Sequence, residues 1–99
     1  MKSKYSEVIG ELIKNERLTR KMTLRELADK ASLYYGKKIN HTSLMRYENE
    51  GRSMDIDVLI AILKAQGIDF GEFMDNVQRI VERGEYEQIQ EREIYKSTI

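Results

Sequence analysis

The stretch INHTSLMRYENEG, residues 39–51, contains the only histidine in the sequence and has two chemically different sides. If Asn40 begins a helix, each later residue advances about 100° around the helix axis. One side then carries Ser43, Leu44, Tyr47 and Glu48, and the other carries His41, Thr42, Met45, Arg46 and Asn49. The first side has the composition of a face that packs on a core. The second is neither apolar nor a simple run of charge, so it points to a function.

The composition limits the class of protein. A chain of 99 residues suits one domain, and 40% hydrophobic residues allow one modest core although 34% of the residues are charged. The sequence contains no cysteine, which excludes a disulfide framework and a thiolate metal site and fits a cytoplasmic location. We expect no signal peptide, because no continuous apolar stretch follows the basic residues at the start. We also expect no membrane span, because no run of about 18 apolar residues occurs.

Charge is unevenly distributed, although the formal net charge is zero. Residues 1–52 contain 12 Lys and Arg against 7 Asp and Glu, whereas residues 53–99 contain 5 against 10. The first half is therefore basic and the second half is acidic. Such asymmetry indicates a surface that meets a polyanion. The alternative is ordinary scatter among surface charges.

The helical spacing of apolar residues predicts an all-α fold, a bundle of five helices. The four apolar stripes outside residues 39–51 comprise Tyr5, Val8, Ile9, Leu12 and Ile13; Leu24, Leu27, Ala28 and Ala31, extending to Tyr34 or Tyr35; Val58, Leu59, Ile62 and Leu63; and Phe70, Phe73, Val77, Ile80 and Val81. Thr23 and Glu26 have the spacing of a capping box. We expect Gly36, Gly67 and Gly84 to end helices.

The pattern divides the chain into a helical domain, residues 1–83, and a C-terminal tail, residues 84–99. Apolar residues in the tail fit neither helical nor strand spacing, so its conformation stays open. They have no evident place in a core that five helices already complete, and apolar residues beyond a finished core usually mark an interface. We therefore expect residues 70–99, with the tail as a dimerisation arm, to join two copies of the chain.

Three stretches carry a resemblance to a known family. They are IGELIKNERLTRKMTLRELADKAS at residues 9–32, INHTSLMRYENEG at 39–51 and DVLIAILKAQGIDF at 57–70. Over roughly residues 8–75 their order and spacing resemble the helix-turn-helix domain of the lambdoid-repressor/Cro, or XRE, family. The specific features are a Thr-capped second helix containing ELA, a third helix ending in a Tyr-Glu pair near a glycine, and Gly-Ile after the fourth helix. The resemblance implies a lambda-repressor-like bundle that places its third helix in the DNA major groove, usually as a dimer.

The sequence departs from the family pattern at three places. Leu24 stands where members often have glutamine, and Met54 replaces a common proline before the fourth helix. The segment SLYYGK, residues 32–37, lengthens the connection between the second and third helices by about six residues, so the usual tight turn is absent. We expect the second helix to extend to Tyr35 and Gly36 to turn the chain, which brings the lysines that follow next to the DNA backbone.

The exposed side of the third helix carries side chains that suit base edges. The major groove admits one helix, and short polar or forked donor side chains distinguish the base pairs there. Arg46 is able to form two hydrogen bonds to guanine, the Thr42 methyl group to contact thymine, and His41 to donate or accept a bond. We predict that these three residues contact bases. For His41 alone an ordinary surface position is the alternative, and its neighbours on the same face favour the contact.

Other polar residues are predicted to contact the DNA backbone, which fixes register without specifying sequence. By family position these are Asn40, Ser43 and Asn49. The cations expected to add charge along the same edge are Arg17, Arg20, Lys21, Lys37, Lys38 and Arg52. For each lysine the alternative is a solvated surface position.

Arg17 and Glu48 also have a predicted structural role. Arg17 extends the apolar stripe of the first helix, and Glu48 lies on the core side of the third. Charges at core-facing positions need partners. In the family the matching residues form a salt bridge between these helices, so the resemblance implies an ion pair here.

The predicted function is a sequence-specific, double-stranded DNA-binding regulator of transcription, expected to be a repressor and a homodimer. The alternative is an antitoxin or another protein-interaction module built on the same bundle, with a regulatory protein as partner for its acidic half. One histidine, no cysteine and no recognisable nucleophile–base set argue against an enzyme, and equally against a metal site or a cofactor.

Overall fold

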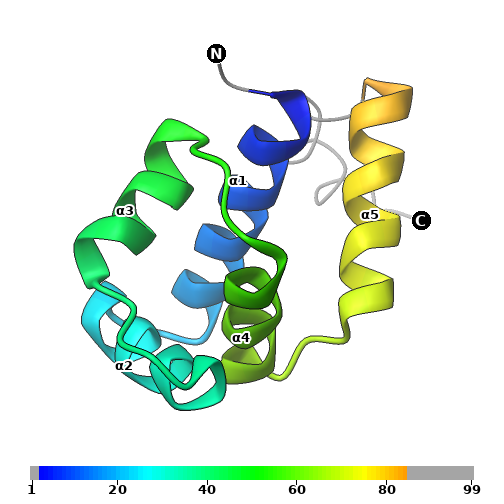
Figure 1. The fold of residues 1–99 in the computed structure, drawn as a ribbon. Helices are drawn as coiled ribbons and strands as arrows, with labels where there is room; N and C mark the ends of the chain where they lie inside the picture. Colours follow the sequence, from blue (N-terminus) through cyan, green and yellow to red (C-terminus); the bar gives the residue numbers. More distant parts are fainter. Residues whose placement is uncertain (1–2, 85–99) are drawn as a thin grey trace.

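The computed structural model describes residues 3–84, and in this range the chain forms five helices and no strand (Figure 1). The helices are α1 (Lys4–Thr19), α2 (Leu24–Tyr35), α3 (His41–Glu50), α4 (Ile56–Gln66) and α5 (Phe70–Arg83). The predicted all-α fold with five helices is confirmed for this part of the chain. The predicted tail, apart from Gly84, lies outside the described residues. Within them, no helix has the length and apolar character needed to cross a membrane.

Local sequence signals explain where the helices begin and end. Thr23 and Glu26 form the predicted capping box: the Glu26 amide donates to Thr23 Oγ1 at 3.0 Å, and the Thr23 amide donates to Glu26 Oε1 at 2.8 Å. Hydrogen bonds from the Thr23 amide and hydroxyl lower the pKa of Glu26, because they favour the carboxylate. Asn40 stands at the N-cap of α3 as predicted, but its side chain makes no capping hydrogen bond. Gly36 ends α2 with φ 81°, a left-handed conformation that glycine adopts without strain.

The core lies where the apolar stripes of the helices meet. Its largest fully buried side chains are Val8, Ile13, Leu27, Leu44, Ile62, Leu63 and Val77. α2 packs mainly on α4, whereas α3 and α5 pack on α1 (Figure 1). For two aromatic residues the predicted burial is wrong, since Tyr5 is 44% exposed and Phe70 is 37% exposed. Both lie in the first turn of their helices, at the ends of the stripes.

α1 and α3 touch backbone to backbone at Gly10. A Cβ atom built on Gly10 would overlap the Tyr47 carbonyl oxygen and would lie 3.0 Å from the Tyr47 carbonyl carbon and 3.3 Å from Glu48 Cα. These neighbours are backbone atoms of α3, so no change of rotamer relieves the overlap. The two helices come this close only because position 10 has no side chain.

Replacing Gly10 by alanine is expected to destabilise the protein, because the added methyl group must push α3 away from α1. An extra methyl group in a packed contact typically costs about 1–3 kcal/mol, and contact with backbone places Gly10→Ala in the upper part of this range. Gly71→Ala is the matched control, since its Cβ would meet only the Asp69 side chain, at 3.2 Å. Urea unfolding compares both variants with the parent. A Gly10→Ala variant as stable as Gly71→Ala would contradict the backbone contact.

Candidate nucleic-acid interface

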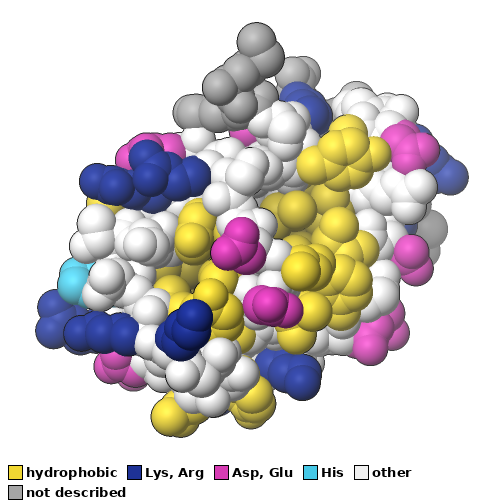
Figure 2. Space-filling view, in the orientation of Figure 1, with side chains coloured by type: hydrophobic (Ala, Val, Ile, Leu, Met, Phe, Trp, Pro, Cys, Tyr) yellow, Lys and Arg dark blue, Asp and Glu magenta, His cyan; other side chains and the backbone are white. Residues whose placement is uncertain are grey.

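The two predicted sides of α3 face the core and the solvent. Leu44 is fully buried and Glu48 is 4% exposed, while Ser43 and Tyr47 are partly buried. The exposed residues of the opposite side are His41, Thr42, Met45, Arg46 and Asn49. α3 lies at the left edge of the bundle in Figure 1, and Figure 2 shows His41 at that edge with Lys and Arg side chains above and below it. The polar side of α3 is therefore at the molecular surface, next to positive charge.

One stripe of α1 holds the C-terminal part of α3. Gly10, Lys14 and Arg17 follow one another at helical spacing, and all three contact residues 47–49. Lys14 Nζ donates to Asn49 Oδ1 at 3.0 Å, so the side chain of Asn49 is already bonded within the protein. Sequence reasoning missed Gly10 and Lys14, because neither a glycine inside a helix nor a lysine in a charged helix indicates a contact by itself.

Arg17 and Glu48 form an ion pair inside the bundle. Arg17 Nε donates to Glu48 Oε2 at 2.8 Å, and Nη2 donates to Oε1 at 3.0 Å. The remaining nitrogen, Nη1, donates to the Met22 carbonyl oxygen at 2.8 Å. Arg17 is 8% exposed and Glu48 is 4% exposed. The forked guanidinium satisfies both carboxylate oxygens, as a buried carboxylate requires.

This geometry corrects one predicted role of Arg17, which is also predicted from the sequence to contact the DNA backbone. The guanidinium group is nearly buried, and Nε, Nη1 and Nη2 all donate hydrogen bonds within the protein. A group held in this way has no access to phosphate. Arg17 is therefore a structural residue, and it is removed from the set of DNA contacts.

The segment between α2 and α3, residues 36–40, is anchored to the bundle. Ile39 is 6% exposed, and its amide donates to Ser32 Oγ at 2.8 Å, while the Ser32 hydroxyl donates to the Ala28 carbonyl oxygen at 2.7 Å. The two lysines before Ile39 stay exposed. The predicted turn at Gly36 is confirmed, but the anchor was missed. Its only sequence signal is one isoleucine between two lysines and an asparagine.

The remaining cations predicted to contact the DNA backbone are exposed and have different surroundings. Arg20 forms an ion pair with Glu16, and Arg52 Nη2 lies 4.0 Å from Glu50 Oε1. Lys21 turns the chain between α1 and α2 with φ 56°. Residues other than glycine rarely adopt this left-handed conformation. All three cations remain accessible to a ligand at the surface.

Tyr47 connects α3 to the segment that follows it. Burial raises the pKa of the Tyr47 phenol, the Asp55 carboxylate and the Tyr35 phenol raise it further, and Arg52 opposes them. The phenol therefore keeps its proton at neutral pH. Its ring packs against the core, so Tyr47 stabilises the inner side of α3.

No protein-family model matches the chain, and no curated protein or solved structure matches it. Within residues 3–84, no three His, Asp or Glu side chains gather so as to hold a metal ion. What this part of the chain offers is one exposed polar helix face flanked by cations, and such a surface suits contact with a polyanion.

Removing the Glu48 carboxylate is expected to strand the Arg17 charge inside the bundle. Removing one partner of a buried ion pair lowers the free energy of unfolding by about 3–5 kcal/mol. Glu48→Ala should therefore unfold at a much lower urea concentration than the parent. Glu16→Ala is the matched control, because Glu16 pairs with Arg20 at the surface. An exposed pair contributes less than about 1 kcal/mol. Equal unfolding midpoints for Glu48→Ala and Glu16→Ala would show that the buried pair does not stabilise the fold.

Proposed function

We propose that the chain is a sequence-specific, double-stranded DNA-binding regulator of transcription that acts as a repressor. In this proposal α2 and α3 act as a helix-turn-helix unit, and α3 enters the major groove. One observation carries it: His41, Thr42 and Arg46 are exposed together on α3. Within residues 3–84, no hydrogen bond or ion pair engages their side chains. The fold does not depend on these three side chains, so they are available for contact with another molecule.

The dimensions of α3 suit the major groove. A helix with its side chains is about 10–12 Å wide, and the groove is about 12 Å wide. Thr42 and Arg46 are separated by about one helical turn, roughly 6 Å along the axis, which spans neighbouring base pairs about 3.4 Å apart. Arg46 would bond guanine through its fork, and Thr42 would place its methyl group against thymine. His41 lies at the start of the helix, where side chains of a recognition helix meet base edges.

Groups around α3 would hold the DNA backbone. The exposed lysines Lys37 and Lys38 precede α3, and Arg52 follows it. The side chain of Asn40 makes no capping bond, so the first amides of α3 remain open to a phosphate oxygen. Arg20 and Lys21, at the turn after α1, would extend the same contact. These groups supply sequence-independent affinity, which falls as salt concentration rises.

A protein-interaction module, such as an antitoxin, is the second candidate. Exposed apolar residues favour it, since Ile56 is 54% exposed and Phe70 is 37% exposed in the acidic half of the chain. Apolar surface with acidic neighbours suits a basic protein partner. Such a partner would bind α4 and α5, and α3 would then contribute little sequence preference to any DNA binding.

We further propose that the functional unit is a homodimer. One domain of this size contacts few base pairs, which is too little to select one site in a genome. Two copies related by a two-fold axis double the contacts and require half-sites about 34 Å apart. α5 would form part of the interface. The other residues proposed for it, Tyr86, Ile89, Ile94 and Tyr95, lie outside the described residues.

Selection from random duplex DNA is expected to yield a preferred sequence for the parent protein. On that sequence Arg46→Ala should lose about 1–3 kcal/mol of binding free energy and relax the preference at one base pair, because a fork to guanine is removed. Fluorescence anisotropy with the selected duplex and with a scrambled duplex measures both effects. Equal losses on the two duplexes would show that Arg46 contacts only phosphate.

Two control variants separate the classes of contact. Lys38→Gln should lower the affinity of the protein for both duplexes by the same factor. It should also reduce the slope of log affinity against log salt concentration by about one. Lys30→Gln removes an exposed cation from α2 that is neither a proposed DNA contact nor part of the proposed dimer interface, so it should leave both affinities unchanged. A loss with Lys30→Gln as large as that with Lys38→Gln would show that the contact at Lys38 is not specific to that position.

Ending the chain after Gly84 tests the dimer, because this truncation keeps all five helices and removes the rest of the predicted tail. We expect a folded monomer with much weaker binding to the selected duplex, since one half-site is lost per complex. Light scattering and circular dichroism measure mass and helix content. Full-length chain that is monomeric at tens of micromolar, with and without DNA, would refute the dimer.

A further inference from the structure

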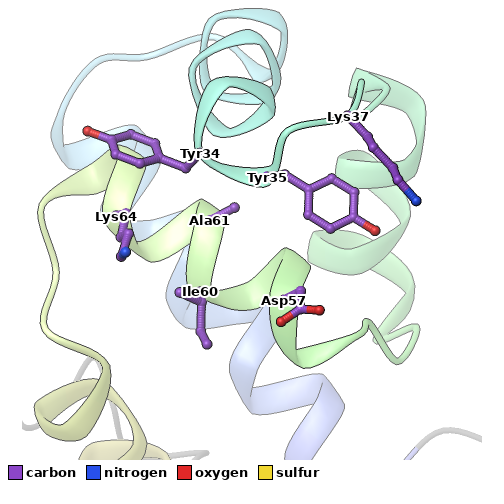
Figure 3. Close-up of a pocket in the computed structure, with 7 residues that line it drawn as sticks. All are labelled: Tyr34, Tyr35, Lys37, Asp57, Ile60, Ala61 and Lys64. Carbon is purple, nitrogen blue, oxygen red and sulfur yellow. The ribbon is translucent and has the colours of Figure 1, made fainter.

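A hollow of about 340 Å³ lies between the C-terminal end of α2 and α4 (Figure 3). This volume falls within the range of small-molecule sites in proteins. On one side it is lined by the end of α2 and the residue that follows the turn, namely Tyr34, Tyr35 and Lys37. On the other side it is lined by one face of α4, namely Asp57, Ile60, Ala61 and Lys64.

Polar groups make up the larger share of the lining, and the two tyrosine rings, Ile60 and Ala61 supply its apolar part. Tyr34 is 54% exposed, and Tyr35 is partly buried against the core. Figure 3 shows the Tyr34 ring at one end of the hollow, the Tyr35 ring at the other, and Ala61 between them. Ala61 is 2% exposed, so the apolar surface open to a ligand is mainly that of Tyr34 and of the partly buried Ile60. A planar ring would bury apolar area there.

Three charged side chains line the hollow and form no ion pair within the described residues. They are Lys37, Lys64 and Asp57. Two ammonium groups against one carboxylate make the lining positive. In Figure 3 Asp57 lies at the same end as Tyr35 and Lys37, whereas Lys64 lies at the Tyr34 end. The carboxylate offsets the charge of Lys37, so the Tyr34 end carries the excess positive charge.

We propose that this hollow binds a small aromatic carboxylate. The ring packs on Ile60 beside Tyr34, and the carboxylate of the ligand accepts a charge-assisted hydrogen bond from Lys64. Two ammonium groups would repel a cation, and a neutral ring would form no charge-assisted hydrogen bond with Lys64. The ligand class follows from this combination of ring-sized space and excess positive charge.

Titration of the ¹⁵N-labelled full chain with 2-naphthoate tests the site. We expect saturable shifts of amide signals at Tyr34, Ala61 and Lys64. The neutral 2-naphthylmethanol and the ringless acetate should each bind about tenfold more weakly or not at all, because each lacks one half of the interaction. Naphthoate shifts that do not saturate, or that spread evenly over surface lysines, would overturn the proposal.

Variants of exposed residues make the test specific. Lys64→Gln and Tyr34→Ala should each weaken naphthoate binding about five- to tenfold. Lys30→Gln and Leu33→Ala are matched controls, since these residues are exposed on α2 and do not line the hollow. They should bind like the parent. The same spectra report whether each variant is folded, so naphthoate binding by folded Lys64→Gln at parental affinity would overturn the assignment.

Lys37 links this hollow to the proposed DNA surface, so we expect the ligand to act as an effector; this consequence rests on the proposed function. Saturating 2-naphthoate should weaken binding of the parent to its selected duplex severalfold and should leave Lys64→Gln unaffected. An unchanged affinity of the parent would contradict the effector role. The titration without DNA is independent of this measurement, so failure of DNA binding and failure of the ligand site are distinguishable.

Discussion

The contact between α1 and α3 is the constraint on which the proposed surface depends. α3 has ten residues, which is too short for an isolated helix to be stable in water, so packing determines its orientation. Gly10 allows the two backbones to meet, and the pair between Arg17 and Glu48 fixes which side of α3 faces inward. Once Glu48 and Leu44 are buried, the opposite side of the helix must face the solvent. The polar face is exposed for this reason.

A buried ion pair adds little net stability to a helix contact, because both charges lose their hydration. Its directional hydrogen bonds explain its presence between α1 and α3. Apolar residues in place of such a pair often give equal or greater stability, but they pack in several orientations. The guanidinium group of Arg17 bonds both carboxylate oxygens of Glu48 and also the Met22 carbonyl oxygen. It therefore holds α3 and the turn between α1 and α2 in fixed positions relative to α1. We interpret the pair as a device that sets the angle of α3. The pair matters for stability because removing either partner would leave the other charge buried and unpaired.

Local sequence patterns were sufficient to predict the helices and the capping box. Apolar periodicity located the five helices, and the spacing of Thr23 and Glu26 located a capping box. Features that depend on tertiary packing could not be derived in this way. The contact at Gly10 and the anchor at Ile39 require knowledge of what faces them. The two roles assigned to Arg17 were separated only by its burial, and the base contacts assigned to α3 remain predictions.

In the proposed complex the exposed side of α3 enters the DNA major groove while its inner side stays fixed on α1. An amide-shift map of the ¹⁵N-labelled full chain with its selected duplex tests this most directly. We expect the shifts to concentrate at residues 37–46, with smaller shifts at the backbone-contacting cations Arg20, Lys21 and Arg52, while Gly10 and α5 keep the signals of the free protein. Shifts concentrated on α4 and α5, with residues 41–46 unchanged, would contradict it.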